Sequence, residues 1–122
     1  MPKPILNLLV LRTANLDASL VFYKCLGLEF VEEQHGTGSF HYACEIGGTV
    51  IEMFPGKPGT APDRRTAGAT VLGFQVTNID ELVETLQNSG SIVLTSAQES
   101  SYGRRAVVQD PDGRAIELNQ LA

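Results

Sequence analysis

The sequence is short of several features, and each shortage excludes a class of protein. It has two cysteines, Cys25 and Cys44, which form no Cys-x-x-Cys pair and imply no disulfide framework. No apolar run approaches the roughly 20 residues that a membrane span needs. The first residues also lack the long apolar stretch of a signal peptide. These shortages predict a cytoplasmic protein with reduced thiols and no membrane contact.

Basic residues are scarce as well. Nine Lys and Arg stand against 14 Asp and Glu, which gives a net charge of −5. Apart from two arginine pairs, at 64–65 and 104–105, the basic residues are scattered along the chain. A nucleic-acid-binding surface is therefore not expected, and the acidic balance favours cationic ligands.

What the chain does contain is an internal repeat. Residues 48–52 read Gly-Thr-Val-Ile-Glu, and residues 113–117 read Gly-Arg-Ala-Ile-Glu. Each segment places one glutamate, Glu52 or Glu117, in an apolar run just after a glycine. Because an unpaired buried charge is costly, the same oddity at two matched positions indicates a two-fold arrangement with a site between the halves.

The repeat includes a helix in each half. Asn15-Leu16-Asp17 matches Asn78-Ile79-Asp80, and each stretch ends near a glycine, Gly27 or Gly90. Asparagine is a good helix N-cap, and a left-handed glycine commonly ends a helix. We expect Asn78 to cap the second helix, with Glu81 completing a capping box.

Short apolar runs predict the strands. In the first half they cover residues 5–12, 28–33, 40–46 and 49–54; in the second they cover residues 70–77, 91–97, 105–109 and 114–119. Residues 5–12 are almost continuously apolar, which predicts a strand buried on both faces. The Gly47-Gly48 pair predicts a hairpin turn.

Together these elements predict one α+β domain made of two tandem βαβββ modules. The first module is expected at residues 4–55, a linker at 56–68 and the second module at 69–122. The sheets are expected to be mixed, mainly antiparallel and curled around a cavity.

Three segments resemble the vicinal oxygen chelate superfamily, which includes glyoxalase I, bleomycin resistance proteins and extradiol dioxygenases. They are residues 11–23, 26–30 and the Asp-Pro-Asp-Gly-Arg-Ala-Ile-Glu-Leu run at 110–118. The resemblance covers nearly the whole chain and implies the glyoxalase/bleomycin resistance fold. It leaves the function open, because functions vary widely on one fold.

The resemblance also implies where a metal would bind, with ligands from the first and last strand of each module. The two repeated glutamates match the last-strand positions. The first-strand positions fall at Leu8 and Val71, or at Asn7 and Thr70 if the register is one residue earlier. Zinc, nickel and iron sites usually contain imidazole or thiolate ligands. We therefore expect no resident cofactor, with a divalent cation held weakly by the two glutamates as the alternative.

The glutamates themselves allow two interpretations. Strand alternation puts Val50, Glu52 and Phe54 on one face, which lines the cavity in the resembled family; the alternative is a solvent-facing position. His35 is expected to be solvated in a hairpin loop, and His41 either faces the cavity or is half-exposed. The candidate ligand-binding residues are Leu8, Val71, Phe54, His41, Tyr102 and Arg105.

The resemblance implies a protein that binds a small molecule, a drug or metabolite, without the usual transition-metal site, and that forms a homodimer. The absence of tryptophan argues against a stacking-rich site for bleomycin itself. The alternative function is a lyase or an isomerase or epimerase that uses Glu52 and Glu117 as catalytic groups. A purely structural domain is a third possibility.

Overall fold

The computed structural model describes residues 2–38, 40–59, 70–101 and 103–121. It contains two compact units, Met1–Pro58 and Gly59–Ala122. The segment expected as a linker lies mostly at 60–68, outside the described residues.

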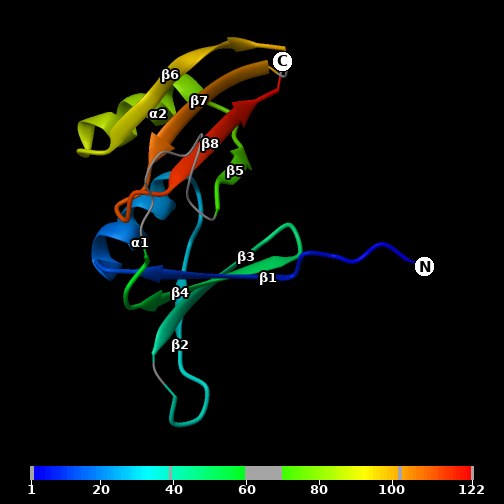
Figure 1. Cartoon of the computed structure of the whole chain (residues 1–122), viewed down its shortest axis with the longest axis vertical. Coiled ribbons are helices and arrows are strands. Elements are labelled where there is room, and N and C mark those ends of the chain that lie inside the picture. Colours follow the sequence, from blue (N-terminus) through cyan, green and yellow to red (C-terminus); the bar gives the residue numbers. More distant parts are fainter. Residues whose placement is uncertain (1, 39, 60–69, 102, 122) are drawn as a thin grey trace. The chain divides into compact units, whose positions relative to one another are not determined.

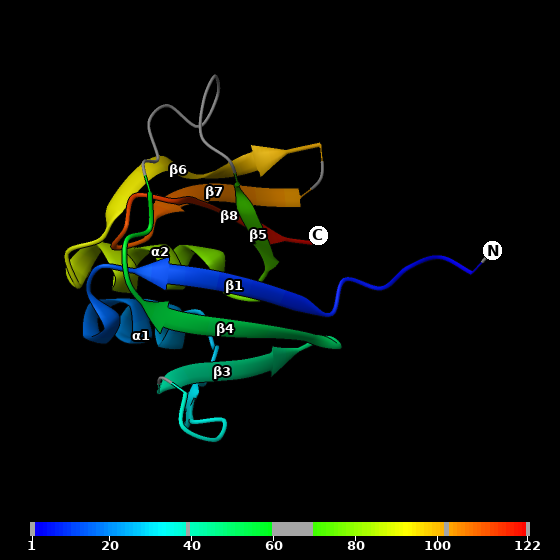
Figure 2. The same cartoon turned by 60° about the horizontal axis from the view of Figure 1, so that its bottom comes forward.

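The first unit is a four-stranded sheet with one helix. Its elements are β1 (Leu8–Thr13), α1 (Leu16–Cys25), β2 (Val31–Glu33), β3 (His41–Ile46) and β4 (Thr49–Pro55). The strand order is β1-β4-β3-β2, so the first and last strands of the unit are neighbours (Figures 1 and 2). The β1–β4 pair is parallel and the other two pairs are antiparallel.

The second unit repeats this plan. Its elements are β5 (Leu72–Gln75), α2 (Ile79–Asn88), β6 (Ile92–Ser100), β7 (Gly103–Gln109) and β8 (Ala115–Gln120). Its strand order, β5-β8-β7-β6, has the same parallel and antiparallel pairs in the same places. The predicted α+β class and the duplicated βαβββ topology are confirmed.

Side chains alternate between the two faces of the first sheet. On β4, Ile51 and Met53 are 4% and 0% exposed, whereas Glu52 between them is only partly covered. The helix α1 contacts β4, and its Phe22 and Tyr23 rings are buried. Glu52 therefore lies on the face opposite the apolar core of the unit.

The expectation that β1 is buried on both faces is wrong. Leu11 and Thr13 are buried, but Leu8 and Val10 are 49% and 41% exposed. Apolar side chains therefore cover both faces of this strand, although only one face is packed within the described part of the first unit. A continuous apolar run could not reveal this difference, because both faces carry the same residue type.

The turns follow the predicted glycine chemistry. Gly47 and Gly48, between β3 and β4, have φ values of 56° and 86°, as a type I′ hairpin requires. Gly27 and Gly90 end α1 and α2 with φ values of 99° and 96°.

The two helix starts differ. Asn15 caps α1 as predicted, because its side chain accepts a hydrogen bond from the Ala18 N–H at 3.1 Å. Asn78 makes no such bond, so the predicted cap is wrong. Instead the side-chain oxygen of Gln120, on β8, accepts the Ile79 N–H at 2.8 Å. A partner 41 residues away replaces the local one.

The first turn of α2 is also tied to the sheet by an ion pair. Both guanidinium contacts from Arg104 to the Asp80 carboxylate are 2.7 Å long, and they hold the pKa of Asp80 below its ordinary range. A depressed folded-state pKa stabilises the native state above the unfolded-state value, about pH 4, and this stabilisation is lost as the pH falls through the folded-state value.

We therefore expect Asp80→Asn to flatten the loss of stability that occurs as the pH falls below about 4. Urea unfolding at a series of pH values measures this. Arg104→Met should remove the same pH dependence, and the double variant should add little. An unchanged acid limb in Asp80→Asn would contradict the assignment.

Within the described residues, neither helix combines the length and apolar character needed to cross a membrane.

Candidate functional site

Four polar side chains gather on the face of the first sheet that points away from its core. The strand register places Ala43 of β3 opposite Glu52, and His41 of β3 opposite Glu33 of β2. Residues paired across strands point to the same face, as do residues two apart on one strand. Glu33, His41 and Glu52 therefore share one face.

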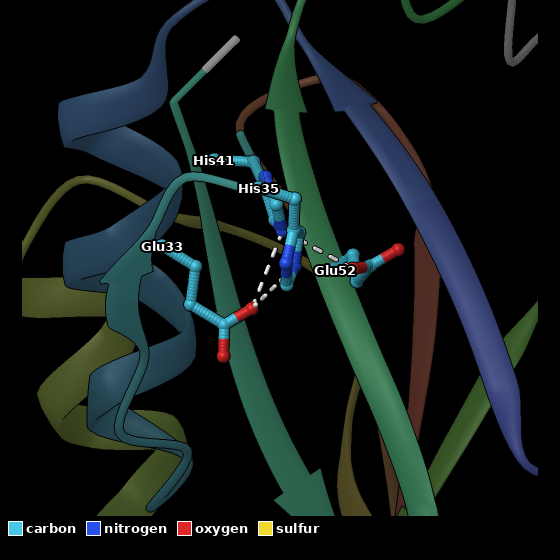
Figure 3. Close-up of side chains that lie close together, drawn as sticks. All are labelled: Glu33, His35, His41 and Glu52. Atoms are coloured by element: carbon cyan, nitrogen blue, oxygen red, sulfur yellow. Dashed lines mark ion pairs between the residues drawn. The ribbon is translucent and has the colours of Figure 1, made fainter. Parts of the chain in front are cut away.

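The distances within this group are short. The Nε2 atom of His41 lies 3.4 Å from Glu33 Oε2 and 3.2 Å from Glu52 Oε2. The Nε2 atom of His35, in the β2–β3 loop, lies 3.3 Å from the same Glu33 oxygen. One ligand atom from each residue falls within 4.8 Å of every other. Figure 3 shows the four side chains directed toward one another. We call Glu33, His35, His41 and Glu52 the Glu/His cluster.

Aromatic packing fixes the central imidazole. The His41 ring is stacked on Phe54, with centroids 4.5 Å apart and planes 11° apart. The Arg12 guanidinium lies 4.7 Å from the centroid of Phe54. The residue His41 is only 3% exposed. Its ring therefore has little freedom to turn, and Nε2 stays aimed at the two carboxylates.

His35 is held by its loop. Its carbonyl accepts the Gly38 N–H at 3.0 Å, and the Gln34 side chain donates to the Gly38 carbonyl at 2.8 Å. Gly36 supplies a φ of 61° for the bend. The His35 side chain is 75% exposed, which agrees with the predicted solvated loop. Its place beside Glu33 was not predicted.

The second sheet has an analogous but simpler arrangement. Arg105 of β7 donates to Glu117 of β8 in a short contact. Arg105 precedes Val107, the cross-strand neighbour of Glu117, by two residues, just as His41 precedes Ala43. Arg105 is thus the counterpart of His41, and Gln98 on β6, which faces Arg105, is the counterpart of Glu33. Each repeated glutamate therefore has a basic partner from the same place in its module.

Charge distinguishes the two arrangements. In the second sheet one permanent cation, Arg105, balances one carboxylate, Glu117. In the first sheet two carboxylates flank imidazoles, which are cationic only when protonated. Two carboxylates with ligand oxygens within 4.8 Å of each other attract a cation to the space between them, so the Glu/His cluster is suited to holding one.

The positions at which the resembled family would place its other metal ligands do not fit a metal. Leu8 and Val71 have no ligand atoms, and they are 49% and 46% exposed. A metal held by Glu52, Glu117 and imidazoles at these two positions is therefore not compatible with the residues present. Each of the two side chains exposes apolar surface on its own unit.

The remaining candidates are placed as follows. Phe54 is half-buried in the stack with His41, and Arg105 is engaged with Glu117. Tyr102 lies outside the described residues. A surface hollow of about 370 Å³ lies elsewhere in the first unit, between α1 and the segment that leads into β2; its lining residues are Leu20, Lys24, Leu28, Glu29, Phe30 and Val31.

Sequence reasoning missed Glu33 and did not connect His35 with His41. A signal was present in the spacing Glu33-x-His35-x5-His41, which has three possible ligands around one hairpin. Such spacing is compatible with a metal site only when the two strands pair in the right register. The observed pairing of Glu33 with His41 supplies that register.

Comparisons with known proteins agree with this fold. The chain is 28% identical over 110 residues to an uncharacterized protein of Mycolicibacterium smegmatis, covering 90% of this chain and 88% of the other. Among solved structures, TnmS3, an antibiotic binding protein from Streptomyces sp. CB03234, superposes with a TM-score of 0.69 at 21% identity over 100% of this chain and 99% of the other. Lactoylglutathione lyase from Agrobacterium tumefaciens gives a TM-score of 0.65 at 18% identity, covering 98% and 96%.

These structural likenesses show the fold. The sequence profile of the Glyoxalase/Bleomycin resistance protein/Dioxygenase superfamily matches residues 5–118, nearly the whole chain. The chain therefore belongs to the glyoxalase/bleomycin resistance protein/dioxygenase superfamily.

Proposed function

We propose that the protein binds a small organic molecule, an antibiotic or a metabolite, without using the metal position usual in its superfamily. The observation that carries this proposal is the make-up of the sheet face around Glu52. Leu8 and Val10 are exposed there beside a carboxylate and the Phe54 ring. Apolar surface with a few directed polar groups is the usual composition of a small-molecule site.

The charge of this face favours a ligand with a cationic group. Glu33 and Glu52 are partly exposed, with side-chain exposures of 41% and 21%, and the chain carries a net charge of −5. An amphipathic cation would place its apolar part on Leu8 and Val10 and its charge near the carboxylates. TnmS3, which has the same fold, is described as an antibiotic binding protein.

We further propose that the protein is cytoplasmic, as its sequence predicts, and a homodimer, as the family resemblance implies.

A thermal-shift screen of cationic and neutral antibiotics and metabolites, run with EDTA present, tests the proposal. A compound that binds the native state at 100 times its Kd should stabilise the protein by about 2.7 kcal/mol. For each such compound, Leu8→Lys is expected to raise Kd about tenfold or more, because it puts a cation on the apolar part of the face.

Val21→Lys is the matched control. Val21 is 60% exposed on α1, so this change adds the same charge at an exposed valine away from the proposed face. A panel without any stabilising compound, or equal losses in both variants, would argue against the proposal.

The second candidate function is that of a lyase, isomerase or epimerase. The observation in its favour is the 3.2 Å contact between His41 and Glu52, a geometry suited to proton transfer. Lactoylglutathione lyase from Agrobacterium tumefaciens shares the fold. Compounds from the screen should therefore be re-analysed after incubation. Conversion that is lost in Glu52→Gln while binding persists would favour this second function.

A further inference from the structure

We propose that the Glu/His cluster is a binding site for a divalent first-row transition metal such as Zn²⁺, formed entirely by the first unit. The ligand atoms are the Nε2 atoms of His35 and His41 and one oxygen each of Glu33 and Glu52. The site differs from the position usual in the superfamily, with which it shares only Glu52. It uses the two carboxylates that the cationic group of the ligand proposed above would contact, so a bound metal and that cationic group exclude each other.

The distances support a common centre. Two ligand atoms about 2.1 Å from a tetrahedral zinc ion lie about 3.4 Å from each other. The three measured nitrogen–oxygen distances in the cluster are 3.2, 3.3 and 3.4 Å. Three of the six pair distances therefore match those of a tetrahedral zinc shell, and every pair lies within 4.8 Å.

A simple ion-pair network explains this geometry less well. One Nε2–H bond can point well at only one acceptor, yet His41 Nε2 lies at similar distances from Glu33 on β2 and Glu52 on β4. Both distances also exceed the roughly 2.7–2.9 Å of a charge-assisted N–H···O hydrogen bond. A cation placed between these atoms would contact all of them at once.

The chemistry of the donors selects the metal class. Two neutral imidazoles with two carboxylates carry a charge of about −2, which a divalent ion neutralises. Imidazole nitrogen suits zinc, iron, nickel and copper, whereas Mg²⁺ and Ca²⁺ prefer oxygen ligands alone. The stack on Phe54 holds the His41 imidazole in place before the metal arrives, and a backbone hydrogen bond shapes the loop that carries His35.

The two units provide an internal comparison. At the places of His41 and Glu33, the second unit has Arg105 and Gln98. A guanidinium cannot act as a ligand, and its charge repels a cation. The duplicated scaffold thus offers the site in the first unit and a permanent positive charge in its place in the second.

The test is isothermal titration calorimetry with Zn²⁺ and, separately, Mg²⁺, on untagged full-length protein treated with EDTA and desalted. We expect one Zn²⁺ per chain and no measurable heat with Mg²⁺. Glu33→Gln and Glu52→Gln should each raise the Kd for Zn²⁺ by more than about 100-fold, since even outer partners of metal ligands cost 10- to 100-fold. His35→Gln should raise the Kd for Zn²⁺ only about tenfold, because His35 is the most exposed of the four ligands.

Glu45→Gln is the matched control. Glu45 lies on β3, on the same face and two residues beyond Ala43, and it is exposed outside the cluster. Its replacement should leave the Kd unchanged within about twofold. Glu117→Gln should also leave it unchanged; a loss there equal to that in Glu52→Gln would point to a metal shared by the two repeated glutamates and would overturn the proposal.

A second measurement does not depend on any variant. Substoichiometric Mn²⁺, a paramagnetic ion, should broaden the imidazole NMR signals of His35 and His41 in the wild-type protein before it broadens signals from α1, on the opposite face of the same sheet. The absence of Zn²⁺ binding, undiminished binding in both Glu33→Gln and Glu52→Gln, or broadening elsewhere would each refute the site.

Discussion

Replacing Asp110 with alanine is expected to lower the free energy of unfolding by about 3–4 kcal/mol. The Asp110 side chain is 0% exposed. Its Oδ1 accepts the Asp112 N–H and the Arg114 N–H, each at 2.9 Å, and its Oδ2 accepts from the Arg114 guanidinium at 3.0 Å. Alanine removes these charge-assisted hydrogen bonds and takes from the guanidinium a buried carboxylate partner.

The measurement is urea unfolding at neutral pH, with a fall in melting temperature of about 10 °C or more as the companion readout. Asp110→Asn grades the effect, because the amide keeps an acceptor for the two backbone N–H groups but loses the charge. It should cost roughly half as much. The double variant Asp110→Ala/Arg114→Met should recover none of the loss, since Arg114 keeps the Asp112 carboxylate as a partner, at 3.4 Å, after Asp110 is replaced. A cost below about 1 kcal/mol for Asp110→Ala would show that the turn does not depend on this carboxylate.

This turn also shows why much of the fold could be predicted from the sequence. The Asp-Pro-Asp-Gly run at residues 110–113 encodes its conformation locally, and Gly113 has the expected positive φ of 91°. The Gly47-Gly48 hairpin and the Asn15 cap are equally local. The repeated segments match each other, and the turns between them are short. Because short connections keep consecutive elements adjacent, the duplicated βαβββ order is predictable from the sequence.

The features that the sequence did not reveal are those that depend on distant partners. The start of α2 is capped by Gln120, which no nearby pattern announces. The Glu/His cluster depends on the register between β2 and β3, which sets Glu33 beside His41. A shift of one residue would turn one of these side chains to the other face. The sequence therefore predicted where the repeated glutamates lie but not which groups surround them.

The repeated glutamates illustrate this difference best. Glu52 and Glu117 are single carboxylates in otherwise apolar strands, with side chains 21% and 43% exposed. Their partners, His41 and Arg105, come from matched positions on β3 and β7. The glutamate thus has a titratable partner, His41, in the first module and a permanent cation, Arg105, in the second.

The second large effect is expected at Gly103, the first residue of β7. Gly103 has a φ of 108°, and a Cβ atom added there would collide with the backbone carbonyl oxygen of Gln120. It would also lie 3.3 Å from the Gln120 carbonyl carbon and from the Leu121 Cα. These are backbone atoms of the paired strand, so they cannot turn away as a side chain would. We expect Gly103→Ala to cost about 3 kcal/mol or more.

Gly90→Ala separates the collision from backbone strain. Gly90 has a similar φ of 96°, but an added Cβ would meet no atom within 4 Å. Gly90→Ala should therefore lower the free energy of unfolding by only about 1–2 kcal/mol, the strain of an alanine in the left-handed conformation. The difference between the two variants in urea unfolding measures the steric part alone. Arg104 and Arg105 follow Gly103 directly and pair with Gln120 and Asn119. Gly103→Ala should therefore also lower the protection of the Arg105 amide against hydrogen exchange, as measured by NMR. An equal loss of unfolding free energy in the two alanine variants would contradict this prediction. It would mean that β7 and β8 can move apart at this end without loss of stability, so that no fixed register would hold Arg105 beside Glu117.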